Sequence, residues 1–204
     1  MKTKLSIIIP TYNREQWLER ALNSVPLAED YQVIVIDDGS TDDTWWIIDK
    51  WFDKNSMRMS PKSVRWRCLK NKGVANAMNI GFDLAEGEYI VSLSDDDCFV
   101  TNFSKFMPYL DGKNDLVYFD LQINDGTVWH LDKITKHKYV GAVKFIRRKF
   151  LGDIRVPDLK YREDVPFSKQ LYAKNPIEVF TSIILKHYNY PHEGSLTWQA
   201  CNEN

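Results

Sequence analysis

The sequence predicts an α/β fold, with a mostly parallel central sheet and helices on both of its faces. Short β-branched, apolar runs alternate with segments of helical spacing through the first half of the chain. The connections between these segments are short, as they are in strand–helix–strand units with right-handed crossovers. The length of 204 residues suits one domain with a sizeable core, and no internal repeat or linker divides the chain. We therefore expect a single domain over residues 1–204.

The elements of the first half follow in order along the chain. Each expected strand is a short apolar run of the kind that is buried on both faces of a parallel sheet, and the strands span residues 5–9, 32–36, 64–69 and 88–93. Each expected helix repeats its apolar residues at helical spacing, and the helices span residues 13–25, 45–52 and 73–85. The second half is less regular, with strands expected at 115–120 and 177–185, a hairpin turn at 124–126 and a helix at 163–173.

Polar clusters follow three of the expected strands. They are the segments 10–14, 37–44 and 94–97. In open parallel sheets, ligands bind beyond the carboxyl ends of the strands, so all three clusters should open onto one edge. The sequence therefore predicts a ligand site at this edge.

The acidic triplet Asp95-Asp96-Asp97 is the strongest of these signals. Three adjacent carboxylates repel one another, and the end of a buried strand screens that repulsion poorly. A hard divalent cation removes this cost, and Mg²⁺ is usually held by one or two carboxylates together with substrate phosphates. A solvated acidic turn that caps a helix is the alternative interpretation of the triplet alone.

Asp37, Asp38 and Tyr12 lie at the same expected edge. A carboxylate in this position can accept hydrogen bonds from a nucleobase or a ribose, and the tyrosine ring can stack on a base. The alternative for Asp38 is an acid that caps the following helix.

The composition argues against several classes of function. A net charge of −1 gives no field that would attract nucleic acid. Three widely spaced cysteines show no zinc-site spacing and indicate free thiols in a reducing compartment. No apolar stretch reaches the roughly 20 residues of a membrane span, and the first apolar run is too short for a signal peptide, so we expect a cytoplasmic protein. Basic clusters at 133–138 and 147–149 are either solvated faces or contacts with an anionic ligand or the inner face of a membrane.

Four segments of the sequence together resemble glycosyltransferase family 2, which has the GT-A fold. They read IIIPTYNR, VIVIDDGSTDDT, NKGVANAMNIGFDLAEGEYI and LSDDD, and they follow in the order and spacing of that family. The resemblance is strong up to about Asp97 and looser beyond, where FIRR, YREDVPF and HYNYPHEGSLT resemble later family segments. It implies a nucleotide-sugar-binding half over residues 1–97 and an acceptor-binding half over residues 98–204.

The resemblance also implies roles for individual residues in the first half. A nucleotide pocket would be lined by Pro10, Thr11 and Tyr12, with Asp37 bonded to the base, most often uracil. The nucleotide-sugar would lie near two residues, Lys72 and Asn79, unless these only shape their loop.

The acidic triplet corresponds to the metal-binding acidic motif of the family. Asp95 would lie near the ribose or diphosphate and Asp96 would bind Mn²⁺ or Mg²⁺, with Asp97 as a supporting group or second ligand. The chain departs from the commonest pattern at Ser94, where an aspartate usually stands.

The resemblance makes Asp164 the catalytic base. Inverting sugar transfer needs a carboxylate to take the proton of the attacking hydroxyl, and a cation to stabilise the leaving diphosphate. The alternative for Glu163 and Asp164 is an acidic pair at a helix start, which the helix dipole favours.

Several other side chains are weaker candidates. His187 and His192 are candidates for metal or diphosphate contact, Arg147 and Arg148 for phosphate or acceptor contact, and two tryptophans, Trp129 and Trp198, for stacking on a sugar.

The sequence thus predicts a metal-dependent, inverting glycosyltransferase with a UDP-sugar as the favoured donor. The acceptor would be a hydroxyl of a saccharide or lipid-linked glycan, as in surface polysaccharide biosynthesis. Two alternatives are a non-catalytic nucleotide- or sugar-binding relative, which the serine at Ser94 favours, and a nucleotidyltransferase. A nucleotidyltransferase usually has a glycine-rich loop after its first strand, and residues 10–14 of this chain contain no glycine.

Overall fold

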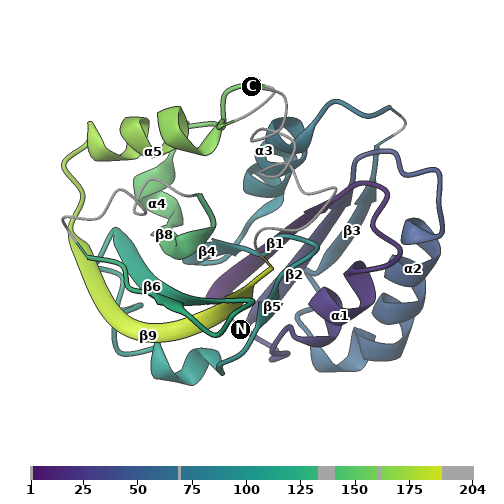
Figure 1. Cartoon of the computed structure of the whole chain (residues 1–204), viewed down its shortest axis with the longest axis horizontal. Coiled ribbons are helices and arrows are strands. Elements are labelled where there is room, and N and C mark those ends of the chain that lie inside the picture. The colour runs from purple at the N-terminus through teal and green to yellow at the C-terminus, as the bar shows by residue number, and fades with distance from the viewer. Residues whose placement is uncertain (1, 69, 133–140, 160–161, 190–204) are drawn as a thin grey trace.

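A computed structural model describes residues 2–68, 70–132, 141–159 and 162–189. One sheet runs through them in the order β3-β2-β1-β4-β8-β6-β9-β5, and β7 pairs with β6 (Figure 1). The strands are β1 (Leu5–Thr11), β2 (Tyr31–Asp37), β3 (Val64–Arg67), β4 (Tyr89–Ser92), β5 (Cys98–Phe99), β6 (Leu116–Ile123), β7 (Val128–Trp129), β8 (Lys144–Arg147) and β9 (Glu178–Tyr188).

The first four strands form the parallel half of the sheet. β1 pairs in parallel with β2 and β4, and β2 pairs in parallel with β3. The helices between them are α1 (Leu18–Asn23), α2 (Thr44–Asn55) and α3 (Val74–Leu84), with the 3₁₀ turn η1 (Ser56–Arg58) after α2.

The helices cover both faces of this half. The crossovers through α1 and α2 run toward β3, and the crossover through α3 runs back toward β4. Right-handed crossovers in opposite directions place helices on opposite faces, and Figure 1 shows α1 and α2 side by side, apart from α3. Residues of β1 and β2 are buried almost throughout as a result, which confirms the predicted α/β class.

Helix α1 is shorter than the helix predicted over residues 13–25. Its start is delayed to Leu18 because the preceding residues bond to the turn after β2. Asn13 has a φ of 51°, and its backbone N–H donates to Oγ of Ser40 at 2.8 Å. The backbone N–H of Arg14 donates to Oγ1 of Thr44, also at 2.8 Å. These contacts join the two loops at the carboxyl edge of the sheet.

The second half continues the same sheet. β8 pairs antiparallel with β4 and β6, while β9 lies parallel to β6 and antiparallel to β5. The 3₁₀ turns η2 (Phe103–Lys105) and η4 (Gly141–Val143) and the helices α4 (Arg148–Leu151) and α5 (Asp164–Tyr172) complete it. The predicted hairpin turn joins β6 to β7, with the backbone N–H of Ile123 bonded to the carbonyl of Thr127 at 2.9 Å.

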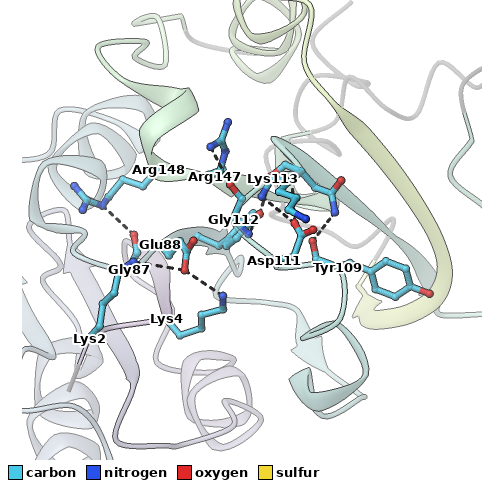
Figure 2. A network of polar contacts seen from close by, with 12 residues as sticks. Lys2, Lys4, Gly87, Glu88, Tyr109, Asp111, Gly112, Lys113, Arg147 and Arg148 are labelled. Carbon is cyan, nitrogen blue, oxygen red and sulfur yellow. Dashed lines mark hydrogen bonds and ion pairs between the residues drawn. The ribbon is translucent and has the colours of Figure 1, made fainter.

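The segment between α3 and β4 passes very close to the backbone of β1. A Cβ atom on Gly87 would lie 2.4 Å from the backbone nitrogen of Ser6, so only glycine fits. The Gly87 N–H donates to Oγ of Ser6 at 2.8 Å, and its carbonyl accepts from Nε of Arg148 at 2.9 Å. The next residue, Glu88, accepts from Nζ of Lys4 at 3.1 Å. Figure 2 shows how Lys4, Gly87, Glu88 and Arg148 join the start of β1 to the start of α4.

Arg147 belongs to the same network. Its Nε donates to Oδ1 of Asp115 at 3.0 Å, and its Nη1 donates to the carbonyl of Gly112 at 3.0 Å. The second oxygen of Asp115 accepts from the backbone N–H of Ile177 at 2.9 Å. The contacts of Arg147 and Arg148 described here are therefore structural, and their contact with phosphate or acceptor stays a prediction.

Other expectations for the chain have mixed outcomes. Cys68 and Cys98 are free thiols, as predicted. Cys201 and the basic cluster at 133–138 lie outside the described residues. In the part of the chain that the structure describes, none of the helices has the length and apolarity needed to cross a membrane.

Candidate active site

The carboxyl ends of β1, β2 and β4 meet at one edge, as the sequence predicted. The last residue of β1, Thr11, stands beside Asp37 in the β1–β2 register. The carbonyl of Thr11 accepts from the backbone N–H of Asp38 at 2.9 Å, and the N–H of Leu93 donates to the carbonyl of Ile8 at 2.9 Å. Two acidic segments, one after each neighbouring strand, therefore flank the end of β1.

Asp37 is fully buried at this edge. Its Oδ1 accepts from the backbone N–H of Ser40 at 2.9 Å. Its Oδ2 lies 3.4 Å from Nε of Arg67 and accepts no hydrogen bond from the described residues. A buried carboxylate oxygen with spare acceptor capacity suits an N–H group of a ligand.

The three predicted pocket residues of β1 lie next to Asp37. Pro10 is half-buried within the strand and Thr11 is buried at its end. Tyr12 is 38% exposed, so its ring is accessible to a ligand.

Asp38 fixes the loop before α3. Its carboxylate accepts from the backbone N–H groups of Lys72 at 3.0 Å and of Gly73 at 2.6 Å. Burial raises the pKa of Asp38, and these two backbone hydrogen bonds oppose the rise. The acid therefore binds the start of α3 and not the start of α2, which was its predicted capping site.

A cavity of about 360 Å³ lies against α3. It is lined by Lys72, Ala75, Asn76, Asn79 and Asp158. Lys72 and Asn79 both line it, and their contact with a nucleotide-sugar stays a prediction.

Asn79 also has a clear structural role. Its Nδ2 donates to the carbonyl of Val156 at 2.9 Å, and its Oδ1 accepts from the backbone N–H of Val156 at 2.8 Å. This residue therefore fastens the loop after α4 to α3 and closes one side of the cavity.

Asp95 is the member of the triplet that faces the loop after β1. Its Oδ1 lies 3.5 Å from Nε of Arg14. Burial and the neighbouring Asp96 carboxylate raise the pKa of Asp95 to about 7, while the Arg14 guanidinium and an N–H of Tyr12 oppose the rise. An excess of negative charge is therefore built into this position.

Asp97 points inward, toward β9. Its Oδ1 accepts from the backbone N–H of Asn189 at 2.9 Å. Burial and the charge of Asp96 raise the pKa of Asp97 to about 7, and the ammonium of Lys186 opposes them.

Lys186 is a fully buried cation that sequence reasoning missed. Its Nζ donates to the carbonyl of Ala142 at 2.7 Å and to the carbonyl of Ser92. Burial lowers the pKa of Lys186 to about 8, and Asp97 and Asp96 oppose the fall. The only signal in the sequence was a lysine at the end of the apolar run 177–185, and nothing local connects it to the triplet.

The carboxylate groups of the triplet are suitable ligands for a hard divalent cation. They supply carboxylate oxygens, and the raised pKa values of Asp95 and Asp97 show that added positive charge would be favourable there. Asp96 is half-buried, and its backbone carbonyl accepts from Nη2 of Arg20 at 2.7 Å. Within the described residues, no group of three or more Asp, Glu, His or Cys side chains could by itself hold a metal. Phosphate oxygens of a ligand would have to complete the coordination.

Asp164 is the first residue of α5. A carboxylate in the first turn is favoured by the helix dipole. Burial raises the pKa of the preceding Glu163, and the charge of Asp164 adds to that rise. Lys144 lies nearby in β8, where its Nζ donates to Oγ of Ser168 at 3.0 Å.

The weaker candidates are placed as follows. His187 stands in β9, opposite Cys98. Trp129 packs edge to face against Tyr188, with ring centroids 5.8 Å apart. His192 and Trp198 lie outside the described residues.

The sequence matches the model of the family described as glycosyl transferase family 2 over residues 6–165. The chain belongs to glycosyl transferase family 2. This match extends from β1 through the acidic triplet to the start of α5, so it includes the residues predicted to bind the nucleotide and the metal and the predicted base, Asp164.

Two curated relatives illustrate the family. The poly(ribitol-phosphate) beta-N-acetylglucosaminyltransferase TarS of Staphylococcus aureus is 24% identical over 192 residues, which are 90% of this chain and 28% of TarS. The UDP-Glc:alpha-D-GlcNAc-diphosphoundecaprenol beta-1,3-glucosyltransferase WfaP of Escherichia coli is 39% identical over 103 residues, which are 48% of this chain and 37% of WfaP. The chain thus spans well under half the length of these relatives.

Two solved structures share the fold. TarS 1-349 in complex with UDP-GlcNAc matches 95% of this chain and 60% of its own with a TM-score of 0.80 and 24% identity. The mannosyltransferase PcManGT of Pyrobaculum calidifontis, in complex with GDP-Man and Mn²⁺, matches 96% of this chain and 59% of its own with a TM-score of 0.73 and 16% identity. These likenesses confirm the expected GT-A fold.

Proposed function

We propose that this chain is an inverting glycosyltransferase that moves a sugar from a nucleotide-sugar, preferably a UDP-sugar, to a hydroxyl group of a saccharide or lipid-linked acceptor. The observation that carries the proposal is the meeting of Asp37 and the acidic triplet at one sheet edge in a family 2 chain. The transferred sugar would be a hexose or an N-acetylhexosamine.

The base and ribose would bind between β1 and β2. Asp37 has an oxygen that can accept from an N–H group of uracil, and the exposed ring of Tyr12 can stack on the base. Pro10 and Thr11 would line this pocket. Lys72 would offer a positive charge to the diphosphate from the rim of the cavity.

Asp96 is the first choice as ligand of Mn²⁺ or Mg²⁺. The family pattern, aligned on Leu93, gives Asp96 the metal, and its side chain is half-buried. Asp97 would act as a second ligand or as support for Asp96, and Asp95 would contact the ribose or diphosphate. When bound, the cation would supply positive charge to the leaving diphosphate.

Asp164 would be the base. Its carboxylate would take the proton of the acceptor hydroxyl while the acceptor oxygen bonds to the anomeric carbon and the bond from that carbon to the diphosphate oxygen breaks. Attack from the side opposite to the leaving group inverts the configuration. WfaP and TarS are named for acceptors that are lipid-linked or polymeric, which supports a saccharide or lipid-linked acceptor here.

The decisive experiment compares wild-type protein with Asp164→Asn. A panel of UDP-sugars is incubated with Mn²⁺ and a lipid-linked or oligosaccharide acceptor, and the release of UDP and the glycosylated product are measured. We expect transfer from one donor by the wild type. We expect loss of at least about 100-fold in the variant, because general-base catalysis contributes about 10²–10⁴-fold.

Calorimetry with UDP and Mn²⁺ is the control. The variant should bind UDP with nearly the affinity of the wild type, since Asp164 is assigned to the acceptor side. Transfer by Asp164→Asn at the wild-type rate would contradict the assignment of the base. UDP binding by the wild type without transfer from any donor would favour the non-catalytic alternative.

A further inference from the structure

Lys144 is a buried lysine close to the predicted base. Its side chain is 1% exposed, and it opens strand β8. The β4–β8 register pairs Ile90 with Ile146, so two further residues bring Lys144 level with Ser92, where β4 ends. Lys144 therefore lies at the edge of the sheet that holds the triplet, level with a residue three positions before Asp95.

The ammonium group reaches α5. Nζ of Lys144 donates to Oγ of Ser168 at 3.0 Å. Ser168 follows Asp164 by four residues in the same helix, so the two side chains share one face. The contact holds the first turns of α5, and with them Asp164, against the start of β8.

Two acidic residues from different elements act on the charge of Lys144. Asp164 of α5 and Glu178 of β9 both favour its ammonium form. Glu178 already accepts from the hydroxyl of Tyr118 at 3.1 Å. The ring of Tyr118, which pairs with Lys144 across β6 and β8, lies 5.7 Å from Nζ. The hydroxyl of Tyr172 contacts that of Tyr118.

A buried ammonium costs several kcal/mol unless opposite charge and hydrogen bonds compensate it. An apolar residue of similar length would fill this core position without that cost. A cation kept beside the predicted base therefore points to a role in holding that carboxylate in one orientation.

We propose that the Lys144 ammonium is a positioning group that fixes the Asp164 carboxylate toward the acceptor. This inference rests on the proposed role of Asp164 as the base. Lys144 acts through Asp164 and does not itself contact the reacting atoms.

The proposal has a consequence for pH dependence. Burial lowers the pKa of Lys144 to about 7 against the opposing charges of Asp164 and Glu178. The lysine is charged below this pKa and neutral above it. Transfer should therefore decline as the pH rises through about 7, because the carboxylate loses its partner.

The first test is Lys144→Met, which keeps the length of the side chain and removes its charge. We expect kcat to fall by about 10- to 100-fold, as for a misplaced catalytic group, with the KM for the donor and the affinity for UDP–Mn²⁺ changed less than about threefold. The decline of kcat above pH 7 should disappear. Lys149→Met, which removes an exposed lysine from α4, is the matched control and should leave kcat and the pH profile unchanged.

A second measurement does not depend on transfer or on the folding of the methionine variant. In protein labelled with ¹³C at the lysine Cε atoms, the Lys144 signal should titrate near pH 7 in the wild type. It should titrate at a clearly lower pH in Asp164→Asn, because the charge that favours the ammonium is gone. Asp158→Asn, at the cavity rim, should leave this titration unchanged.

The outcomes separate this proposal from the proposed function. An unchanged Lys144 titration in Asp164→Asn, or wild-type kcat and an unchanged pH profile in Lys144→Met, would overturn the positioning role. Wild-type transfer by Asp164→Asn would instead overturn the base assignment itself. Two results together support both the positioning role of Lys144 and the role of Asp164 as the base. They are a lower titration pH of the Lys144 signal in Asp164→Asn, and a fall in kcat with little change in KM in Lys144→Met.

Discussion

At the scale of single residues, the acidic triplet is balanced by cations that come from distant parts of the chain. Arg14, from the loop after β1, faces Asp95, and Lys186, from β9, faces Asp97. Each outer carboxylate therefore has one fixed cation, and Asp96 stands between them. Ser94 takes part through its backbone, since its carbonyl accepts from the N–H of Asp97 at 3.1 Å and shapes the turn. Its side chain adds no further negative charge.

Asp96→Ala should remove the effect of Mn²⁺ on UDP binding. Calorimetric titration of UDP with and without Mn²⁺ measures it, and the wild type should bind more tightly with the metal, because a carboxylate and the substrate phosphates can hold one ion together. Asp125→Ala, in the hairpin between β6 and β7, is the control. An Asp96→Ala protein that still gains affinity from Mn²⁺ would rule out its role as a ligand.

Asp95 should make the metal-free protein less stable as the pH rises from about 4 to 7. Its folded-state pKa of about 7 lies above the ordinary value of 3.8, so in this window the folded state binds more protons than the unfolded chain. The sign of the linkage is therefore a loss of stability with rising pH. Asp95→Asn, which cannot ionise, should show a smaller loss.

Urea unfolding at pH 5 and pH 7.5 in the presence of a chelator provides the measurement. Asp97 has the same direction of shift, so the variant should retain part of the dependence. An Asp95→Asn protein with the same pH dependence as the wild type would show that the charge of Asp95 is fully compensated in the fold.

The sequence located the acidic residues of the site but not their cations. Asp37 and the triplet stand directly after apolar runs, so strand patterns were enough to bring them together. Lys144 and Lys186 belong to strands of the second half, and their contacts with the site span 24 to 94 residues of sequence. The pairing of those strands decides such contacts, and no local pattern encodes it.

At the scale of elements, the segment that joins α3 to β4 makes its contacts with β1 and with the start of α4. Gly87 lets the chain cross β1 at backbone contact distance, and Glu88 holds Lys4 (Figure 2). The hydroxyl of Tyr89, the first residue of β4, donates to the carbonyl of Asn114 at 2.7 Å. Arg148 closes the network by donating to Gly87. The motif therefore fixes where β4 begins, and β4 in turn delivers the triplet.

Gly87→Ala should destabilise the protein by about 1–3 kcal/mol, because the new methyl group overlaps the backbone of Ser6. The free energy of unfolding from urea titration checks this value. Glu86→Ala, one residue earlier and exposed, is the control and should change stability by less than about 0.5 kcal/mol. A Gly87→Ala protein as stable as the control would show that β1 and β4 can separate without cost.

The order of elements was predictable, and their ends were less so. The apolar runs of β1 and β2 are nearly continuous, so their positions followed directly from the sequence. Helix α1 was predicted to begin at Asn13, whose side chain is instead engaged by the N–H of Thr41 at 2.9 Å. The apolar pattern was correct there, but hydrogen bonds from another loop decided where the helix begins.

At the scale of the whole molecule, the two predicted halves share one sheet. The β4–β8 pairing joins them directly, and Lys186 spans the junction by bonding to Ser92 of β4 and to Ala142 before β8. Residues 1–97 thus supply the acidic groups, while the rest of the chain supplies the buried cations Lys144 and Lys186 together with Asp164. The division at residue 97 remains a prediction about binding, and neither half completes the site alone.

The position of β9 in the sheet sets an order of events for the nascent chain. This strand is the last that the structure describes, and it inserts between β6 and β5, both of which are synthesised long before it. Until residue 186 has left the ribosome, Asp97 has no ammonium beside it and the triplet repels itself. Contacts of such long sequence separation form slowly, so we expect the parallel half to collapse first and the catalytic edge to become ordered last, when β9 docks.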